Sequence, residues 1–129
     1  MTDDALERAL RTEEELELVT TGRRSGRPHR VTVWFAYEPG ALWLRTDADA
    51  DWLRNLDHEP RALIRIAGRE LAVERVAVDD PARALRSLIE LWRAKYGQDW
   101  VADWYVERGR VPVRLSLVRG GPQAEGYPR

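Results

Sequence analysis

Residues 16–37 read LELVTTGRRSGRPHRVTVWFAY, and this stretch decides the predicted fold. Before and after a basic loop, apolar residues alternate with other residues, as they do in strands that are buried on one face only. The loop, residues 22–28, holds three arginines, a serine, two glycines and a proline. We therefore expect two antiparallel strands joined by a basic loop, with one face made by Leu16, Leu18 and Thr20 and then by Val31, Val33, Phe35 and Tyr37.

Further short strands follow this pair. Turn-forming residues at 38–40 and 67–69 separate apolar stretches that are too short for helices. Four more strands are predicted, around Leu42 and Leu44 and at residues 62–66, 70–78 and 113–117. Most of the six strands are neighbours in sequence and are joined by short turns, which favours hairpins and an antiparallel sheet.

Helices are expected at both ends of the chain and between the strands. The clearest one has Asp80 as N-cap, Pro81 in its first turn and Gly97 as C-cap. Its buried stripe is Leu85, Leu88, Ile89, Trp92 and Tyr96. Shorter helices are predicted at residues 3–12, at 51–56 with Asp51 as N-cap and Pro60 after it, and at 99–109.

These elements predict a mainly β, α+β fold in a single domain over residues 1–129. The expected architecture is a small antiparallel split barrel with an N-terminal helix and two C-terminal helices packed on it. The core is predicted at about residues 15–118, and the Gly- and Pro-rich tail at 120–129 is expected to be loose.

Composition excludes several classes of function. The formal net charge is −1, whereas a nucleic-acid-binding domain usually has a basic excess. The chain has no cysteine and two histidines, which leaves little material for a metal site. The acidic start is unlike a signal peptide and no apolar run has transmembrane length, so we expect a cytoplasmic protein without membrane insertion. The bias toward arginine, with Lys95 as the single lysine, indicates a GC-rich bacterial genome.

The basic loop is the first candidate for chemistry. Backbone N–H groups of a Gly-rich turn can form a nest for an anion, and arginine adds bidentate hydrogen bonds to phosphate or carboxylate. The alternative is a solvated basic turn, which composition alone slightly favours. The loop does not match the phosphate-binding pattern G-x-x-x-x-G-K-[ST], and a strand follows it rather than a helix.

Two motifs together resemble a known family. Residues 18–28, LVTTGRRSGRP, are similar to the signature of the deazaflavin (F420)-dependent nitroreductases. Residues 52–60, WLRNLDHEP, resemble that family's W-x-x-N-L-x-x-x-P segment. The family consists of split-barrel flavin and deazaflavin oxidoreductases, which are related in fold to pyridoxamine-phosphate oxidases. The resemblance covers about residues 15–118, with a weaker match at 96–113.

The resemblance implies a set of site residues. The loop would hold the anionic tail of cofactor F420, while Thr46, Trp52 and Asn55 would lie near the deazaflavin ring or support its pocket. The implied tail-binding residues are Arg23, Arg24, Ser25, Gly26, Arg27 and Pro28. Trp100, Trp104 and Tyr105 would line the substrate pocket, or they pack on the barrel. The candidate proton donors are Tyr105 and Tyr96.

One segment departs from the family pattern. Residues 46–52 read TDADADW, where members of the nitroreductase branch usually carry a lysine and a glycine pair. Aspartates facing an anionic tail would repel it. FMN on the same fold, and a protein that binds a cofactor or ligand without turnover, therefore remain alternatives.

The resemblance also implies a reaction. We expect an oxidoreductase of the nitroreductase or quinone reductase type, which transfers a hydride from reduced F420 to a small planar acceptor such as a quinone, nitroarene or enone. The expected partners are this acceptor and, since related barrels often pair, a second copy of the chain in a homodimer.

Overall fold

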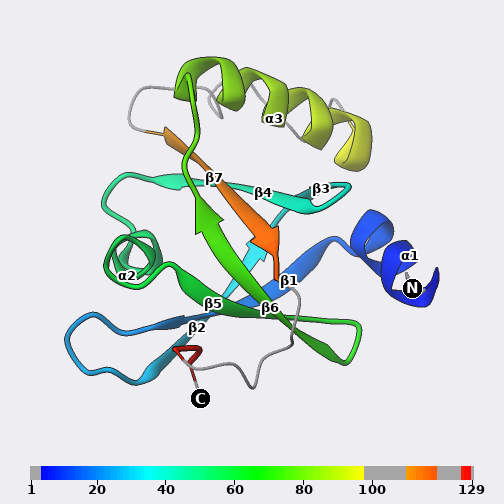
Figure 1. The fold of residues 1–129 in the computed structure, drawn as a ribbon. Helices are drawn as coiled ribbons and strands as arrows, with labels where there is room; N and C mark the ends of the chain where they lie inside the picture. The colour runs from blue at the N-terminus through cyan, green and yellow to red at the C-terminus, as the bar shows by residue number, and fades with distance from the viewer. Residues whose placement is uncertain (1–3, 98–109, 119–125, 129) are drawn as a thin grey trace.

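The computed structural model describes residues 4–97, 110–118 and 126–128. In this part of the chain, seven strands form one antiparallel sheet in the order β2-β1-β5-β6-β7-β4-β3, with three helices around it (Figure 1). The elements are α1 Asp4–Thr12, β1 Glu15–Thr21, β2 Pro28–Trp34, β3 Ala36–Glu38, β4 Ala41–Asp47, α2 Asp51–His58, β5 Arg61–Ile66, β6 Arg69–Val76, α3 Pro81–Tyr96 and β7 Arg110–Leu117. The mainly β class with packed helices is confirmed.

The sheet curls because its two edge strands are consecutive in the chain. β2 and β3 lie at opposite edges of the sheet, yet only Phe35 separates them. The chain therefore crosses from one edge to the other at this residue, whose side chain is completely buried. The sequence predicts one strand through Tyr37, and the structure divides it in two. The alternation nevertheless holds, because Val31, Val33, Phe35 and Tyr37 all contact the main core.

The main core lies inside the curl. It is built by inward-facing aliphatic residues from the strands together with one face each of α1 and α2. The buried members include Leu10, Leu16, Leu18, Leu42, Leu44, Leu53, Leu56, Ile64, Val73, Val113 and Leu115. Burial of this set against strands from the whole chain ties α2 to β1, which positions the basic loop discussed below.

α3 covers the outer face of the sheet at β3, β4 and β7 (Figure 1). Leu85, Leu88, Ile89 and Trp92 form its buried side, as the stripe predicts. Asp80 is the N-cap, and its carboxylate accepts a hydrogen bond from the Arg83 backbone N–H at 3.2 Å. The predicted helix at 99–109 lies outside the described part of the chain.

One local prediction is wrong. Ala50, not Asp51, is the N-cap of α2, and Asp51 is the first helical residue. The Asp51 carboxylate pairs with Arg23 and does not cap the helix. In the tail, Tyr127 is 8% exposed and packs on Val19, Leu63 and Ala72. Burial of an aromatic ring on an apolar sheet face favours this contact.

Candidate functional site

The basic loop between β1 and β2 is a closed turn. The Gly22 N–H donates to the Arg27 carbonyl at 2.8 Å, and the Gly26 N–H donates to the Gly22 carbonyl at 2.8 Å. Gly26 has a φ of +71°, a conformation that glycine adopts without strain. A Cβ on Gly22 would lie 2.5 Å from His29 Nε2, so a larger residue there would displace the His29 side chain. The two backbone hydrogen bonds and the conformation of Gly26 therefore set the shape of the loop.

A buried asparagine fastens the loop to α2. Asn55 is 2% exposed, and its Oδ1 accepts hydrogen bonds from the Arg23 backbone N–H at 3.2 Å and from Arg23 Nη1 at 2.9 Å. Its Nδ2 donates to Thr20 Oγ1 at 3.1 Å, and Thr20 is fully buried. Every polar group of this network has a partner, so it joins β1, the loop and α2 at low energetic cost.

Arg23 is turned inward, away from the other loop arginines. Besides Asn55, its guanidinium contacts the Asp51 carboxylate at 3.3 Å. Arg24, Ser25, Gly26 and Arg27 are exposed. Ser25 Oγ accepts from the Arg27 N–H at 3.1 Å. The structure therefore separates the predicted clamp into an arginine that holds the loop and two arginines that face solvent.

Two of the three aspartates at residues 47–51 form ion pairs. Asp47 forms an ion pair with Arg110 at the start of β7, and Asp51 forms the pair with Arg23. Both partners come from segments remote in sequence, which the sequence pattern alone does not show. The expected repulsion of an anionic ligand by these aspartates is therefore reduced, because each one has an adjacent guanidinium.

The remaining predicted residues near the loop lie at the same end of the barrel. Thr46 is half-buried at the end of β4, where it is opposite Val111 of β7. Trp52 is half-buried on α2 and packs against the main core. Pro28 begins β2 opposite Thr21. A cavity of about 340 Å³ opens beside α2, with Leu56, Pro60 and Val111 in its wall.

Tyr96 lies at the other end of the barrel. Its hydroxyl accepts a hydrogen bond from the Phe35 N–H at 3.3 Å and is 2.5 Å from the Glu14 carbonyl, next to the start of β1. The loop follows the far end of β1, whose seven residues at ~3.3 Å each span about 20 Å. The structure therefore does not bring Tyr96 to the loop. The other candidates, Trp100, Trp104 and Tyr105, lie outside the described residues.

The described residues contain neither a cluster of metal ligands nor a helix that could span a membrane. Among these residues, no group of three or more His, Cys, Asp or Glu side chains is arranged to hold a metal ion. None of the described helices is long and apolar enough to cross a membrane.

Comparison with known proteins identifies the family. A family model described as F420H(2)-dependent quinone reductase matches residues 2–117 of the 129-residue chain. The chain belongs to this family. The resemblance seen in the two motifs is thereby confirmed, and the protein is an oxidoreductase with F420 as its cofactor. No curated protein sequence matches the chain.

Several solved structures share the fold of this chain. HutZ, a heme storage protein from Vibrio cholerae, is 15% identical with a TM-score of 0.73 and covers 92% of this chain and 91% of its own. An F420 reductase is 18% identical with a TM-score of 0.65, and the match covers 87% of this chain and 92% of that protein. A conserved hypothetical protein from Mycobacterium tuberculosis is 22% identical with a TM-score of 0.68, and the match covers 92% of this chain and 82% of that protein. At these identities the likeness establishes the fold alone.

The residues present in this F420-dependent oxidoreductase fit an anionic cofactor tail. Two exposed guanidinium groups and a serine hydroxyl stand on a loop of fixed shape, which suits a phosphate. Sequence reasoning missed Thr20, whose hydroxyl completes the Asn55 network, and missed the inward role of Arg23. A threonine on the predicted core face of β1 was the available signal, because a buried hydroxyl requires a partner.

Proposed function

We propose that this protein transfers a hydride from reduced F420 to a quinone, and that nitroarenes and activated enones serve as further acceptors. The family membership supports the quinone. The main support for the position of the cofactor site is the closed loop at residues 22–27. Arg24 and Arg27 are exposed on this loop, and Asn55 holds its base.

The loop would bind the phosphate of the cofactor tail. Arg24 and Arg27 would provide charged hydrogen bonds, and Ser25 and the Gly26 backbone would complete the contact. In this proposal Arg23 acts through the loop, because its guanidinium already contacts Asn55 and Asp51. A loop held in one shape before binding loses less conformational entropy when the cofactor binds.

The deazaflavin ring would lie toward Thr46 and Trp52. When bound in its reduced form, F420 supplies a hydride from C5 of this ring. The protein must hold the acceptor beside that carbon and exclude water. Trp100, Trp104 and Tyr105 remain the proposed wall for the acceptor. Tyr105 or water would then donate the proton that the reduced acceptor needs, since Tyr96 bonds to backbone atoms at the other end of the barrel.

The test is a titration of the purified protein with F420 and with FMN, followed by fluorescence. We expect saturable F420 binding and weaker FMN binding, and then consumption of reduced F420 when a soluble benzoquinone is added. Tighter binding of FMN than of F420 would show that FMN is the cofactor. If neither compound binds, the proposed cofactor site is wrong. If the protein binds F420 but reduces no quinone, nitroarene or enone, it is a cofactor-binding protein without catalytic turnover.

The proposal includes a cytoplasmic homodimer. Related barrels often pair, and this is the basis for proposing a second copy of the chain as partner. Light scattering of the purified protein at micromolar concentration tests the dimer, and fractionation of the source cells tests the compartment. A monomer across that range, or recovery in the membrane fraction, would contradict these two points without affecting the cofactor assignment.

A further inference from the structure

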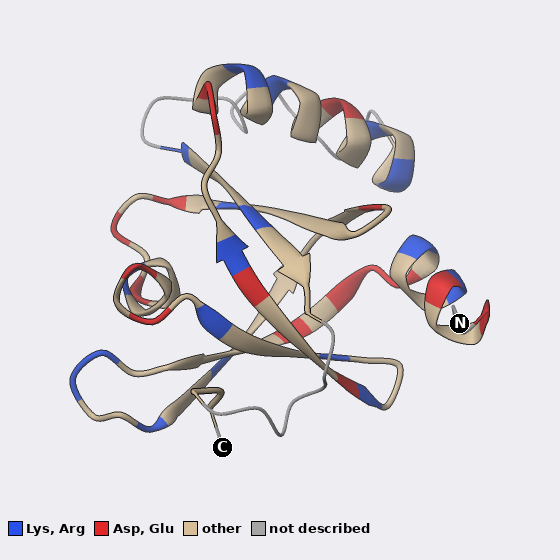
Figure 2. Ribbon diagram, in the orientation of Figure 1, with Lys and Arg blue, Asp and Glu red and all other residues tan. Residues whose placement is uncertain are grey.

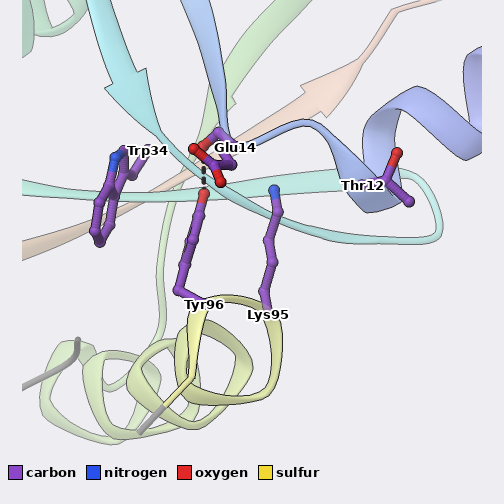
Figure 3. A pocket seen from close by; sticks show the side chains of 5 residues that line it. All are labelled: Thr12, Glu14, Trp34, Lys95 and Tyr96. Atoms are coloured by element: carbon purple, nitrogen blue, oxygen red, sulfur yellow. Dashed lines mark hydrogen bonds between the residues drawn. The ribbon is translucent and has the colours of Figure 1, made fainter. Parts of the chain in front are cut away.

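A second pocket lies at the end of the barrel opposite the basic loop. It has a volume of about 320 Å³, within the range of small-molecule sites. Its wall comes from the α1–β1 junction, the end of β2 and the last turn of α3 (Figure 3). The lining residues are Thr12, Glu14, Trp34, Lys95 and Tyr96. None of these residues belongs to the proposed binding site for the cofactor tail.

Lys95, the only lysine of the chain, reaches into this pocket. Its Nζ donates to the Phe35 carbonyl at 3.0 Å and lies 3.4 Å from the centroid of the Phe35 ring. Burial lowers the pKa of Lys95 to about 8, although the carboxylates of Glu13 and Glu14 act in the opposite direction. Arg11 lines the adjoining cavity that Lys95 also lines. The amine is therefore substantially neutral, and nucleophilic, near pH 8.

An aromatic wall stands beside this amine. The rings of Trp34 and Tyr96 stack with centroids 4.4 Å apart and an interplanar angle of 17°. Tyr96 is itself fixed, because its hydroxyl bonds to the Phe35 backbone on one side and to the Glu14 carbonyl on the other. As Figure 3 shows, Lys95 and Tyr96 extend from the same turn of α3 toward Glu14. A fixed aromatic wall favours a planar ligand.

The charge of the pocket selects the ligand class. Glu14 lines the same space as Lys95, so a carboxylate or phosphate ligand would meet a negative charge. A neutral planar molecule avoids that repulsion and can still react with a neutral amine. A neutral amine reacts reversibly with an aldehyde, without an external oxidant or reductant, and an aldehyde is more reactive than a ketone.

We propose that this pocket is a second small-molecule site, in which Lys95 captures neutral aromatic aldehydes as an imine. The Lys95 nitrogen forms a bond to the carbonyl carbon, and the carbonyl oxygen takes up the proton that the nitrogen loses. The resulting carbinolamine expels water and leaves a C=N bond. The stacked rings of Trp34 and Tyr96 form the wall for the aromatic ring of the aldehyde, and the Tyr96 hydroxyl positions this wall.

The experiment compares two lysines in one folded molecule. Arg86 is exposed on α3, so Arg86→Lys adds an ordinary lysine and leaves Lys95 in place. The full-length variant is treated with benzaldehyde and cyanoborohydride at pH 8, and the adducts are located by peptide mapping. Mapping also separates the α-amino group, whose usual pKa of about 8 makes it reactive as well.

Lys95 should be modified at least about 10-fold faster than the introduced lysine, because about half of its amine is neutral at pH 8 against under about 1% for an exposed lysine. The excess should be larger with benzaldehyde than with propionaldehyde, since only an aromatic ring gains the contact with the wall of Trp34 and Tyr96. Equal rates at the two lysines, or the same preference with both aldehydes, would overturn the proposal.

The role of Tyr96 has its own readout. Tyr96→Phe keeps the ring but removes the hydroxyl that anchors it. We expect the preference for benzaldehyde over propionaldehyde to fall, while Lys95 still reacts faster than the introduced lysine. An unchanged preference would show that Tyr96 does not position the wall. A melting curve of each variant confirms that it is folded.

Discussion

The two ends of the barrel present positive charge in opposite ways. At one end the loop between β1 and β2 carries basic residues (Figure 2). Arg24 and Arg27 are exposed on this loop, and the buried Asn55 holds its base. At the other end the amine of Lys95 is half-buried, and the backbone of Phe35 accepts its hydrogen bond. An exposed guanidinium stays charged and suits an anion, whereas a half-buried amine loses its proton more readily and suits a neutral molecule.

This difference has a structural cause. At the loop end, the buried polar side chains form hydrogen bonds with one another, so the outer arginines of the loop remain outside the core. The opposite end is shaped by the crossing of the chain at Phe35, which leaves backbone groups that Lys95 and Tyr96 bond. The following variants test whether each end works in this way, from the largest expected effect to the smallest.

Asn55→Ala should have the largest effect, since it leaves the Arg23 N–H and the Thr20 hydroxyl without their partner. We expect the free energy of unfolding to fall by about 3 kcal/mol, which urea denaturation measures. Asn55→Asp is the control, because it keeps the acceptor for Arg23 and should lose less. A loss below about 1 kcal/mol in the alanine variant would show that the network does not hold the loop.

Changing Arg24 and Arg27 together to alanine should weaken F420 binding about 100-fold, since two charged hydrogen bonds are removed. Both residues are exposed, so the melting temperature should stay the same. Fluorescence titration measures the affinity. Arg86→Ala, at an exposed arginine on α3, is the matched control and should bind normally. Equal weakening in the control would indicate a general charge effect instead of a site.

Lys95 should make stability depend on pH. Its pKa in the folded protein is about 8, below the ordinary value of 10.5. Between pH 8 and pH 10.5 the unfolded chain binds more protons than the folded protein, so the free energy of unfolding rises with pH. Below pH 8 Lys95 is charged in both states, and the full cost of burying its charged amine lowers stability.

Lys95→Met removes this titration. From pH 7.5 to 9.5, we expect the unfolding free energy of the native chain to gain about 1–2 kcal/mol relative to the variant, after allowing for solvent screening of a half-buried group. Urea denaturation at the two pH values gives this difference. A difference that stays constant with pH would contradict the burial of a charged amine at this end.

Asp51→Asn should have the smallest effect. Its carboxylate is 86% exposed in the pair with Arg23, and exposed ion pairs contribute little. We expect a change below about 0.5 kcal/mol in urea denaturation and no loss of F420 affinity, because Asn55 still holds Arg23. A large loss would mean that the ion pair, and not Asn55, keeps the loop in place.

Much of this fold could be predicted from short stretches of sequence. The α3 cap at Asp80, the apolar stripe at Leu85 and Leu88, and the alternation around Val31 and Val33 each depend on residues close together in the chain. The family resemblance likewise came from two short motifs. The division of the second strand at Phe35 was not predictable in this way, because it depends on where the curled sheet brings its two edges together.

The candidate site shows the same limit at the level of single residues. The sequence placed arginines in the loop but could not show that Arg23 turns toward Asn55, 32 residues away, or that Asp47 pairs with Arg110. Lys95 appeared only as a sign of codon bias, since nothing near it in sequence indicates a pocket. Its environment comes from Phe35, 60 residues earlier.

The sequence by itself therefore determined the class of fold, the basic loop, the long helix and the family, because local spacing sets backbone conformation and motif chemistry. Only the tertiary structure decided which charges are exposed, which are paired and which are buried. Those properties depend on solvent exclusion and on partners from distant segments, and they exist only once the sheet has curled and packed its helices.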